Sequence, residues 1–190
     1  CEFIYIHIYK YIIMYKNIIL AGGCFWCTES VFKTFKGIID VTSGYIGGTV
    51  INPTYEQICT GTTGHAESVK VIFDTEIISL CKVLEIFFTT HDPTQYHRQG
   101  NDIGSQYRSA IFYNEVEDEK IISNAINDAK ALWNSDITTE LNKDGVFYEA
   151  EEYHQDYFSK NPNNAYCMAI IKPKLDKINS IYGSLLEFKV

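Results

Sequence analysis

Hydrophobic positions recur along the chain at two different spacings, and these spacings predict strands that alternate with helices. Unbroken apolar runs or strict alternation with polar residues predict strands at residues 17–21, 38–45, 67–74, 107–113 and 137–141. Apolar positions at helical spacing predict helices at residues 25–35, 80–88 and 115–133. Gly37 ends the first helix and Ser79 caps the second. The sequence therefore predicts an α/β or α+β chain whose helices pack on one sheet.

Two long loops, at residues 49–64 and 91–104, separate these elements, and both are rich in turn-forming residues. Loops of this length are often functional. In the first loop, Asn52 followed by Pro53 predicts a short helix with Asn52 as its N-cap. From Phe147 onward the chain is a polar and aromatic segment.

The chain has 190 residues, which is enough for one domain with a substantial core. We predict a single domain at residues 17–190 and an N-terminal extension at residues 1–16. This extension is too short and too interrupted by polar residues to span a membrane. Met14 fits a natural start, which makes residues 1–13 upstream sequence or a disposable extension. The alternative is that they form an extra edge strand or a docking segment.

The net charge of −8 argues against binding to nucleic acid or to anionic lipid. Only two of the six cysteines, Cys24 and Cys27, are close in sequence, which excludes a disulfide-rich secreted scaffold. A reducing, cytoplasmic compartment with one or two reactive thiols fits better. Cys59 and Cys81 fall on apolar helical positions, where we expect them to be packing residues.

The stretch at residues 21–29 places a cysteine where a strand turns into a helix. An apolar run reaches Gly22-Gly23, and Cys24 follows at the predicted helix start. Unpaired N–H groups and the positive end of the helix dipole favour a thiolate there. Cys24 is therefore the candidate nucleophile. The alternative is a small buried apolar residue, which free cysteine often is.

Cys27 completes a Cys-x-x-Cys spacing with Cys24, so a disulfide between them is geometrically possible. Thiol-disulfide exchange sites prefer small or turn-forming residues between the two cysteines. Phe25 and Trp26 instead suggest the wall of a pocket. A zinc site would need a second pair of ligands, and none stands at a suitable spacing.

Glu67 is the other singular residue, because strand alternation puts it on the same face as Val69, Val71 and Phe73. A carboxyl on an apolar face is costly to ionise, so its pKa should rise until it can donate a proton near neutral pH. The alternative is a strand end at which Glu67 reaches solvent. His65 is a second candidate base, although a loop histidine is more often structural.

These residues lie within a series of motifs that resembles the A-type peptide methionine sulfoxide reductases. Toward the N-terminus the motifs are Gly23-Cys24-Phe25-Trp26, Gly44-Tyr45-x-Gly47-Gly48, Asn52-Pro53-Thr54-Tyr55 and Thr63-Gly64-His65-Ala66-Glu67. Further along they are His91-Asp92-Pro93-Thr94, Arg98-Gln99-Gly100-Asn101-Asp102, Gln106-Tyr107-Arg108-Ser109-Ala110 and Glu151-x-Tyr153-His154-Gln155-Asp156-Tyr157. The resemblance extends from about residue 17 to residue 173.

The resemblance implies a ferredoxin-like two-layer sandwich with a mixed sheet and long functional loops. It also implies that residues 17–190 form a catalytic domain that reduces methionine S-sulfoxide, free or in proteins. By this resemblance, Cys24 attacks the sulfoxide sulfur, and Phe25 and Trp26 form the pocket that holds the methyl group of the substrate. Glu67 protonates the leaving oxygen, and Tyr55 and Tyr107 donate hydrogen bonds to it. Asp102 orders the site. The product on Cys24 is then a sulfenic acid.

A second thiol must then reduce this sulfenic acid. The resemblance favours Cys167 as the resolving cysteine, with Cys27 or direct reduction by an external thiol as alternatives. It implies thioredoxin or another dithiol as reductant, no bound cofactor or metal, and a monomer. The other functions left open are a Cys-x-x-Cys thiol-disulfide oxidoreductase, a Cys-His hydrolase and a non-catalytic binder of oxidised methionine.

Overall fold

The computed structural model describes residues 15–187. The strands are β1 (Tyr15–Gly22), β2 (Ile38–Ile46), β3 (Ala66–Asp74), β4 (Arg98–Gln99), β5 (Asp102–Ile103), β6 (Ser109–Tyr113), β7 (Glu140–Lys143) and β8 (Tyr148–Glu149). The helices are α2 (Phe25–Phe32), α3 (Tyr55–Cys59), α4 (Leu80–Thr90), α5 (Val116–Trp133), α6 (Tyr157–Lys160) and α7 (Lys172–Tyr182). Of the predicted extension, Tyr15 and Lys16 belong to β1, and residues 1–14 lie outside the described residues.

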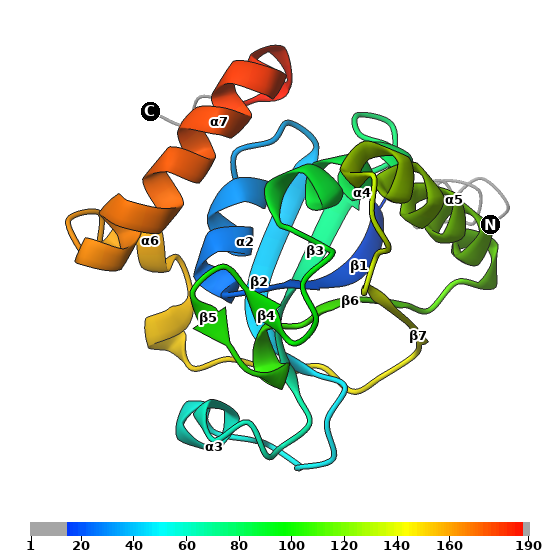
Figure 1. Cartoon of the computed structure of the whole chain (residues 1–190). Coiled ribbons are helices and arrows are strands. Elements are labelled where there is room, and N and C mark those ends of the chain that lie inside the picture. The colour runs from blue at the N-terminus through cyan, green and yellow to red at the C-terminus, as the bar shows by residue number, and fades with distance from the viewer. Residues whose placement is uncertain (1–14, 188–190) are drawn as a thin grey trace, which may run out of the picture.

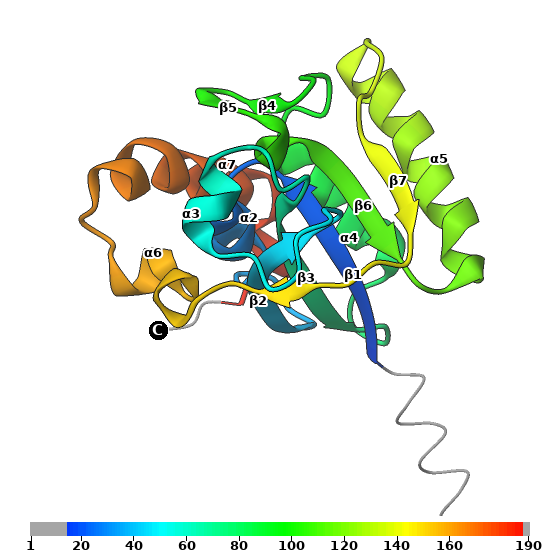
Figure 2. The ribbon, with the colours of Figure 1, turned by 90° about the horizontal axis from the view of Figure 1, so that it is seen from below.

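Six strands form one sheet in the order β7-β6-β1-β3-β2-β8 (Figures 1 and 2). β1 pairs antiparallel with β3 and β6, and β2 pairs antiparallel with β3. With α2 between β1 and β2, and α4 between β3 and β6, this is the β-α-β-β-α-β arrangement of ferredoxin-like folds. β7 joins parallel to β6, so the sheet is mixed, as predicted.

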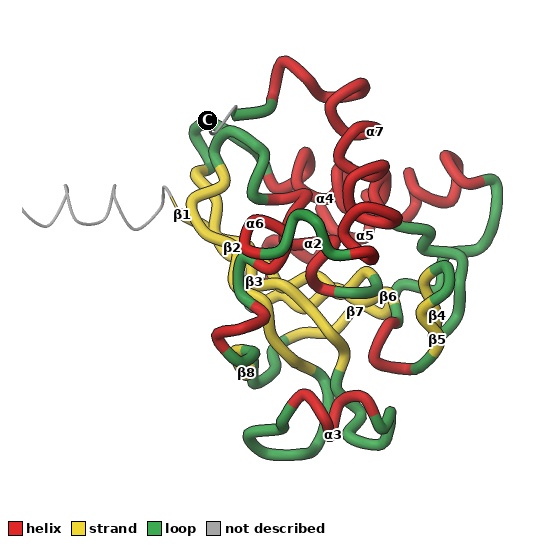
Figure 3. The backbone as a smooth tube through the Cα atoms, turned by 90° about the vertical axis from the view of Figure 1, so that its left-hand side faces the viewer, coloured by secondary structure: helices red, strands yellow, loops and turns green. Residues whose placement is uncertain are grey.

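The helices α2, α4, α5 and α7 cover one face of the sheet (Figure 3). Val69, Val71 and Phe73 point from β3 into the core between this face and the helices, and all three are fully buried. A smaller apolar cluster forms on the opposite face around Ile46 and Phe112. Because successive side chains along a strand point to opposite faces of the sheet, β1, β2, β3 and β6 each contribute residues to both clusters.

Several element boundaries differ from the predictions. Asn52 is not the cap of α3, because Thr54 accepts a hydrogen bond from the Gln57 N–H and the Gln57 side chain binds back to Thr54. Such a reciprocal capping box satisfies two donors, whereas Asn52 adopts a left-handed backbone with φ of 48°. Tyr107 lies in a single 3-10 turn, Ser105–Tyr107, before β6 begins.

The C-terminal third contains helices that the sequence pattern did not predict. A π-helical turn, Cys167–Ile171, leads directly into α7, which contacts α2. α7 buries only Ile178 and Tyr182 among mostly polar residues, so its apolar stripe is too narrow to predict the helix from the sequence.

Cys59 and Cys81 are exposed, so the prediction that they are packing residues is wrong. Within residues 15–187, no helix has the length and apolar character that crossing a bilayer requires.

Candidate active site

The turn between β1 and α2 depends on a glycine and brings Cys24 to the helix start. Gly23 has a φ of 93°, and a Cβ there would come within 2.6 Å of the Gln99 side chain. Cys24 is the N-cap of α2. The Gln99 amide also bonds to the Asp92 backbone, which fixes the β4–β5 hairpin over the turn. The second polar loop therefore lies beside Cys24, as a functional loop should.

Glu67 lies against the same helix start. Its Oε2 accepts a hydrogen bond of 3.1 Å from the N–H of Phe25, the first residue of α2. Glu67 is only 2% exposed, so it does not reach solvent. Burial raises the pKa of Glu67 to about 8, although the hydrogen bond from Phe25 opposes the rise. At pH 7 this carboxyl is mostly protonated and can donate a proton.

Tyr55 and Tyr107 bring their phenols toward this carboxyl from two different loops. Burial, followed by the charge of Glu67, raises the pKa of both Tyr55 and Tyr107 well above its ordinary value. Each phenol therefore remains a hydrogen-bond donor at neutral pH. The charge of Cys24 also raises the pKa of Tyr107.

Cys24 and Cys27 form a hydrogen-bonded pair of thiols in the first turn of α2. Burial raises the pKa of Cys24 well above its ordinary value, and the contact with Cys27 adds to this. The hydrogen bond from Cys24 lowers the pKa of Cys27 to about 7, against the effect of burial. The prediction that Cys24 is the resting thiolate is therefore wrong. Only 9% of the Cys24 surface is exposed, so burial outweighs the helix dipole there, and the lower pKa of the pair belongs to Cys27.

Tyr166 connects this pair to Asp102. Its hydroxyl donates to Asp102 Oδ2 at 3.0 Å and lies 3.6 Å from Cys27 Sγ. Cys167, the next residue, is fully buried, and Cys27 contributes to its raised pKa after burial. Among the other cysteines, it is thus Cys27 whose charge acts on Cys167. No role was assigned to Tyr166 from the sequence, because its only signal was its position next to Cys167.

Phe25 and Trp26 form an aromatic wall together with two residues to which no role was assigned. Trp26 Nε1 donates to His154 Nδ1 at 3.1 Å, and the indole stacks on Tyr157 with ring centres 3.6 Å apart. The His154 ring also lies against Phe25, with ring centres 5.0 Å apart. His154 and Tyr157 belong to the last motif of the sequence, but nothing in that motif indicated that they would contact Trp26.

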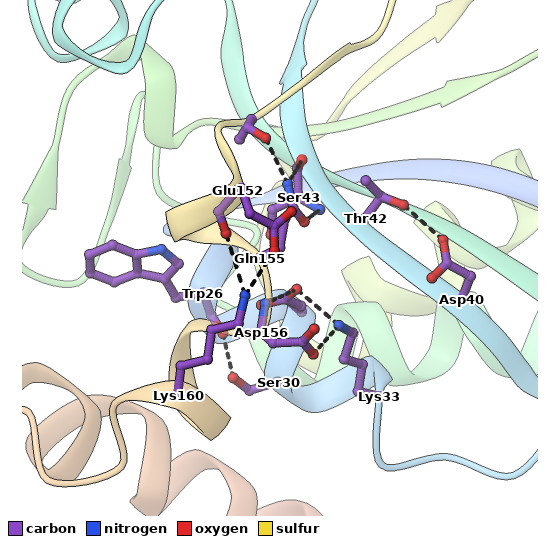
Figure 4. Close-up of polar contacts among 12 residues, drawn as sticks. Trp26, Ser30, Lys33, Asp40, Thr42, Ser43, Glu152, Gln155, Asp156 and Lys160 are labelled. Atoms are coloured by element: carbon purple, nitrogen blue, oxygen red, sulfur yellow. Dashed lines mark hydrogen bonds and ion pairs between the residues drawn. The ribbon is translucent and has the colours of Figure 1, made fainter.

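Residues 150–157, which we call the strap, carry this aromatic support along α2 and the edge of β2 (Figure 4). The Gln155 side chain accepts from Ser43 N–H at 2.9 Å and donates to Ser43 O and Ala150 O. The Asp156 N–H donates to Glu29 Oε1 at 2.9 Å, and Lys33 bonds to Asp156 as well. Gln155 thus pairs with β2 as a short strand would.

Gln155→Leu is expected to destabilise the protein by about 1–3 kcal/mol, because it leaves the Ser43 N–H without its partner and removes one of the two donors to Ser43 O, the other being the Ala150 N–H. It should also raise the KM for a substrate held by Trp26, since the strap carries His154. Urea unfolding and steady-state kinetics measure the two effects. Lys160→Gln is the control, because the Lys160–Glu152 pair is exposed and should contribute less than about 1 kcal/mol. Equal losses in both variants would contradict this account of the strap.

The site as a whole combines a buried neutral acid, two phenol donors, a thiol pair and an aromatic wall. Within residues 15–187, no set of three or more His, Cys, Asp or Glu side chains is arranged to hold a metal ion. The five cysteines in this range are all free thiols. The arrangement can protonate an oxygen atom while a sulfur nucleophile attacks the atom that carries it.

The comparisons with known proteins agree with this chemistry. Residues 16–184 match the family model described as peptide methionine sulfoxide reductase. A peptide methionine sulfoxide reductase MsrA from Psychrobacter sp. is 55% identical over 165 residues, which cover 86% of this chain and 94% of that protein.

Solved structures give the same result. Mxr1 from Saccharomyces cerevisiae in its reduced form has a TM-score of 0.76 at 35% identity, covering 81% of this chain and 90% of that one. Mxr1 in complex with Trx2 has a TM-score of 0.56 at 27% identity, covering 76% and 85%. The chain belongs to the peptide methionine sulfoxide reductase family.

Proposed function

We propose that this protein reduces the S epimer of methionine sulfoxide, free or in proteins, with Cys24 as the nucleophile and Glu67 as the acid. The observation that carries the proposal is the position of Glu67, whose buried carboxyl lies 3.1 Å from the N–H that follows Cys24. A sulfoxide oxygen leaves only when it is protonated, and a carboxyl with a pKa of about 8 holds its proton at pH 7. Tyr55 and Tyr107 donate hydrogen bonds to the same oxygen, and Asp102 orders the site through Tyr166.

In the first step, Cys24 sulfur attacks the sulfoxide sulfur while its proton passes to its hydrogen-bond partner, Cys27. Glu67 gives its proton to the sulfoxide oxygen. The S–O bond of the substrate and the new bond between Cys24 sulfur and substrate sulfur both break as the protonated oxygen bonds to Cys24 sulfur, and methionine leaves the pocket beside Phe25 and Trp26. Sulfur of the substrate is reduced, and Cys24 is oxidised to a sulfenic acid.

In the second step, Cys27 sulfur attacks Cys24 sulfur. The S–O bond of the sulfenic acid breaks, the Cys27 proton leaves with the hydroxyl as water, and a disulfide forms. Contact between the two thiols supports Cys27 over Cys167 as the first resolving residue, although the family resemblance favoured Cys167. The effect of the Cys27 charge on Cys167 supports a later exchange of Cys167 with that disulfide.

An external dithiol completes the cycle, and we propose thioredoxin as this reductant because the related Mxr1 forms a complex with Trx2. A cytoplasmic, reducing compartment and a monomeric state belong to the same proposal.

Turnover of separate S and R epimers of methionine sulfoxide, with dithiothreitol or thioredoxin as reductant, tests the proposed function. We expect methionine from the S epimer only, with either reductant. A folded protein that forms no methionine, or that uses both epimers equally, would contradict the proposal.

Disulfide mapping identifies the resolving cysteine. After one turnover without reductant, peptide mass analysis is expected to find a Cys24–Cys27 disulfide in the wild-type chain. Cys81→Ser serves as a control, because this thiol is exposed on α4, and should give the same map. A Cys24–Cys167 disulfide as the first product would assign the resolving step to Cys167 instead.

A further inference from the structure

Glu151 lies at the start of the strap, where the chain leaves β8 and is fixed against β2. Tyr148 of β8 pairs with Tyr45 of β2, and the Ala150 N–H donates to Ser43 O at 2.9 Å. These bonds on its N-terminal side hold the backbone of Glu151 beside β2. The side chain of Glu151 is half-buried and contacts two tyrosines from different segments.

Each oxygen of the Glu151 carboxylate accepts one of these contacts. Oε2 accepts from the Tyr45 hydroxyl at 2.8 Å, and Oε1 accepts from the backbone N–H of Tyr55 at 2.9 Å. Tyr55 is the first residue of α3, so its N–H has no acceptor within the helix. Although burial opposes the shift, hydrogen bonds from its own N–H, from Tyr55 and from Tyr45 lower the pKa of Glu151. At neutral pH it is therefore a carboxylate whose two oxygens both accept.

The two tyrosines connect Glu151 to opposite sides of the site. Tyr45 is fully buried, is the register partner of Glu67 and has its ring centre 5.8 Å from that of Phe25. Side chains directly opposite each other on paired strands lie on the same face, so Tyr45 lies beside the buried acid. Tyr55 comes from the loop that follows β2 and carries one of the phenols assigned to the sulfoxide oxygen. Glu151 thus joins the strand beside the acid to the helix that bears the phenol.

We propose that Glu151 is a positioning residue that holds the start of α3 in place, so that the Tyr55 phenol stays directed at the oxygen that Glu67 protonates. The inference rests on the roles proposed above for Tyr55 and Glu67. Without the Glu151 carboxylate, the start of α3 loses an anchor and the phenol donates a poorer hydrogen bond as the S–O bond breaks. The methyl pocket of Phe25 and Trp26 would remain. Loss of Glu151 should therefore lower kcat more than it raises KM.

The test compares Glu151→Met, Glu151→Gln and Glu152→Gln with the wild type. Methionine has nearly the length of glutamate but no oxygen, whereas glutamine keeps one oxygen that can accept from the Tyr55 N–H. Glu152 is the matched control, because its carboxylate is exposed and pairs only with the exposed Lys160. Thermal melting verifies that each variant is folded, and Glu151→Ala replaces Glu151→Met should the latter fail to fold.

The first readout is amide hydrogen exchange at Tyr55, followed by NMR without substrate. Exchange of this N–H is expected to be about 10-fold faster in Glu151→Met than in the wild type, because the proton loses its acceptor. Glu151→Gln should lie between the two, and Glu152→Gln should match the wild type. An unchanged exchange rate in Glu151→Met, or an equal increase in Glu152→Gln, would overturn the inference.

The second readout is a double-mutant cycle with Tyr55→Phe, which removes the phenol but keeps the backbone N–H. Glu151→Met should lower kcat by about 3- to 10-fold with less than about a 2-fold change in KM. In the Tyr55→Phe background the same substitution should cost less than about 2-fold. Equal losses in both backgrounds would show a structural role and overturn the inference. Absence of methionine in every variant and in the wild type would count against the proposed function, while exchange at Tyr55 would still test Glu151.

Discussion

Cys24→Ser is expected to lower methionine sulfoxide turnover by about 10⁴-fold or more, because a hydroxyl replaces the only sulfur assigned to attack the substrate. Cys24 is the N-cap of α2 and serine is a good N-cap residue, so the fold should persist. Methionine formation with dithiothreitol as reductant measures the loss, and thermal unfolding measures stability.

Cys81→Ser is the matched control for this variant. Cys81 is an exposed thiol on α4, away from the contacts that define the site, so its loss should leave turnover near the wild-type value. Substantial methionine formation by a folded Cys24→Ser protein would refute the assigned nucleophile. It would direct attention to Cys27, the other thiol of the pair.

Glu67→Gln is expected to slow turnover by about 10²- to 10⁴-fold, the usual contribution of a positioned general acid. Glutamine keeps the size of the side chain but has no proton to transfer to the sulfoxide oxygen. In the wild type, kcat/KM should fall as the pH rises above about 8, where Glu67 loses its proton. The residual activity of Glu67→Gln should lack this alkaline decline. If the decline persists in this variant, a group other than Glu67 causes it.

The same substitution has a predictable effect on stability. The folded-state pKa of Glu67 is about 8, above its ordinary value of 4.5, so the folded state holds the proton more tightly than the unfolded state. The associated stability is present below pH 4.5 and is lost as the pH rises through 8. Relative to the wild type, Glu67→Gln should therefore gain stability with rising pH, on the order of 3–5 kcal/mol by pH 8. Urea unfolding at pH 5 and pH 8 measures the difference.

Local patterns predicted those parts of the site that local geometry determines. The period of two along β3 put Glu67 on the buried face, and the Gly22-Gly23 turn put Cys24 at a helix start. The four central strands and both crossover helices also followed from their apolar spacing. Each of these inferences uses residues within a few positions of one another.

Contacts between distant segments were not predictable in this way. His154 supports Trp26, and Tyr166 reaches Cys27, only because the C-terminal segment folds back over α2. No pattern within one segment reports such a pairing. The charge state of Cys24 was missed for the same reason, since its pKa depends on burial by the whole fold and not only on the helix start.

The most direct test of the central claim is to locate the transferred oxygen. The wild-type protein is mixed with a slight excess of methionine S-sulfoxide in the absence of reductant. It is quenched at short times with a reagent specific for sulfenic acids, and peptide mass analysis locates the label while the methionine is counted. We predict a transient label on Cys24 and one methionine per chain within the first turnover. Methionine formed while the label appears on another cysteine, with Cys24 still a free thiol, would contradict the account.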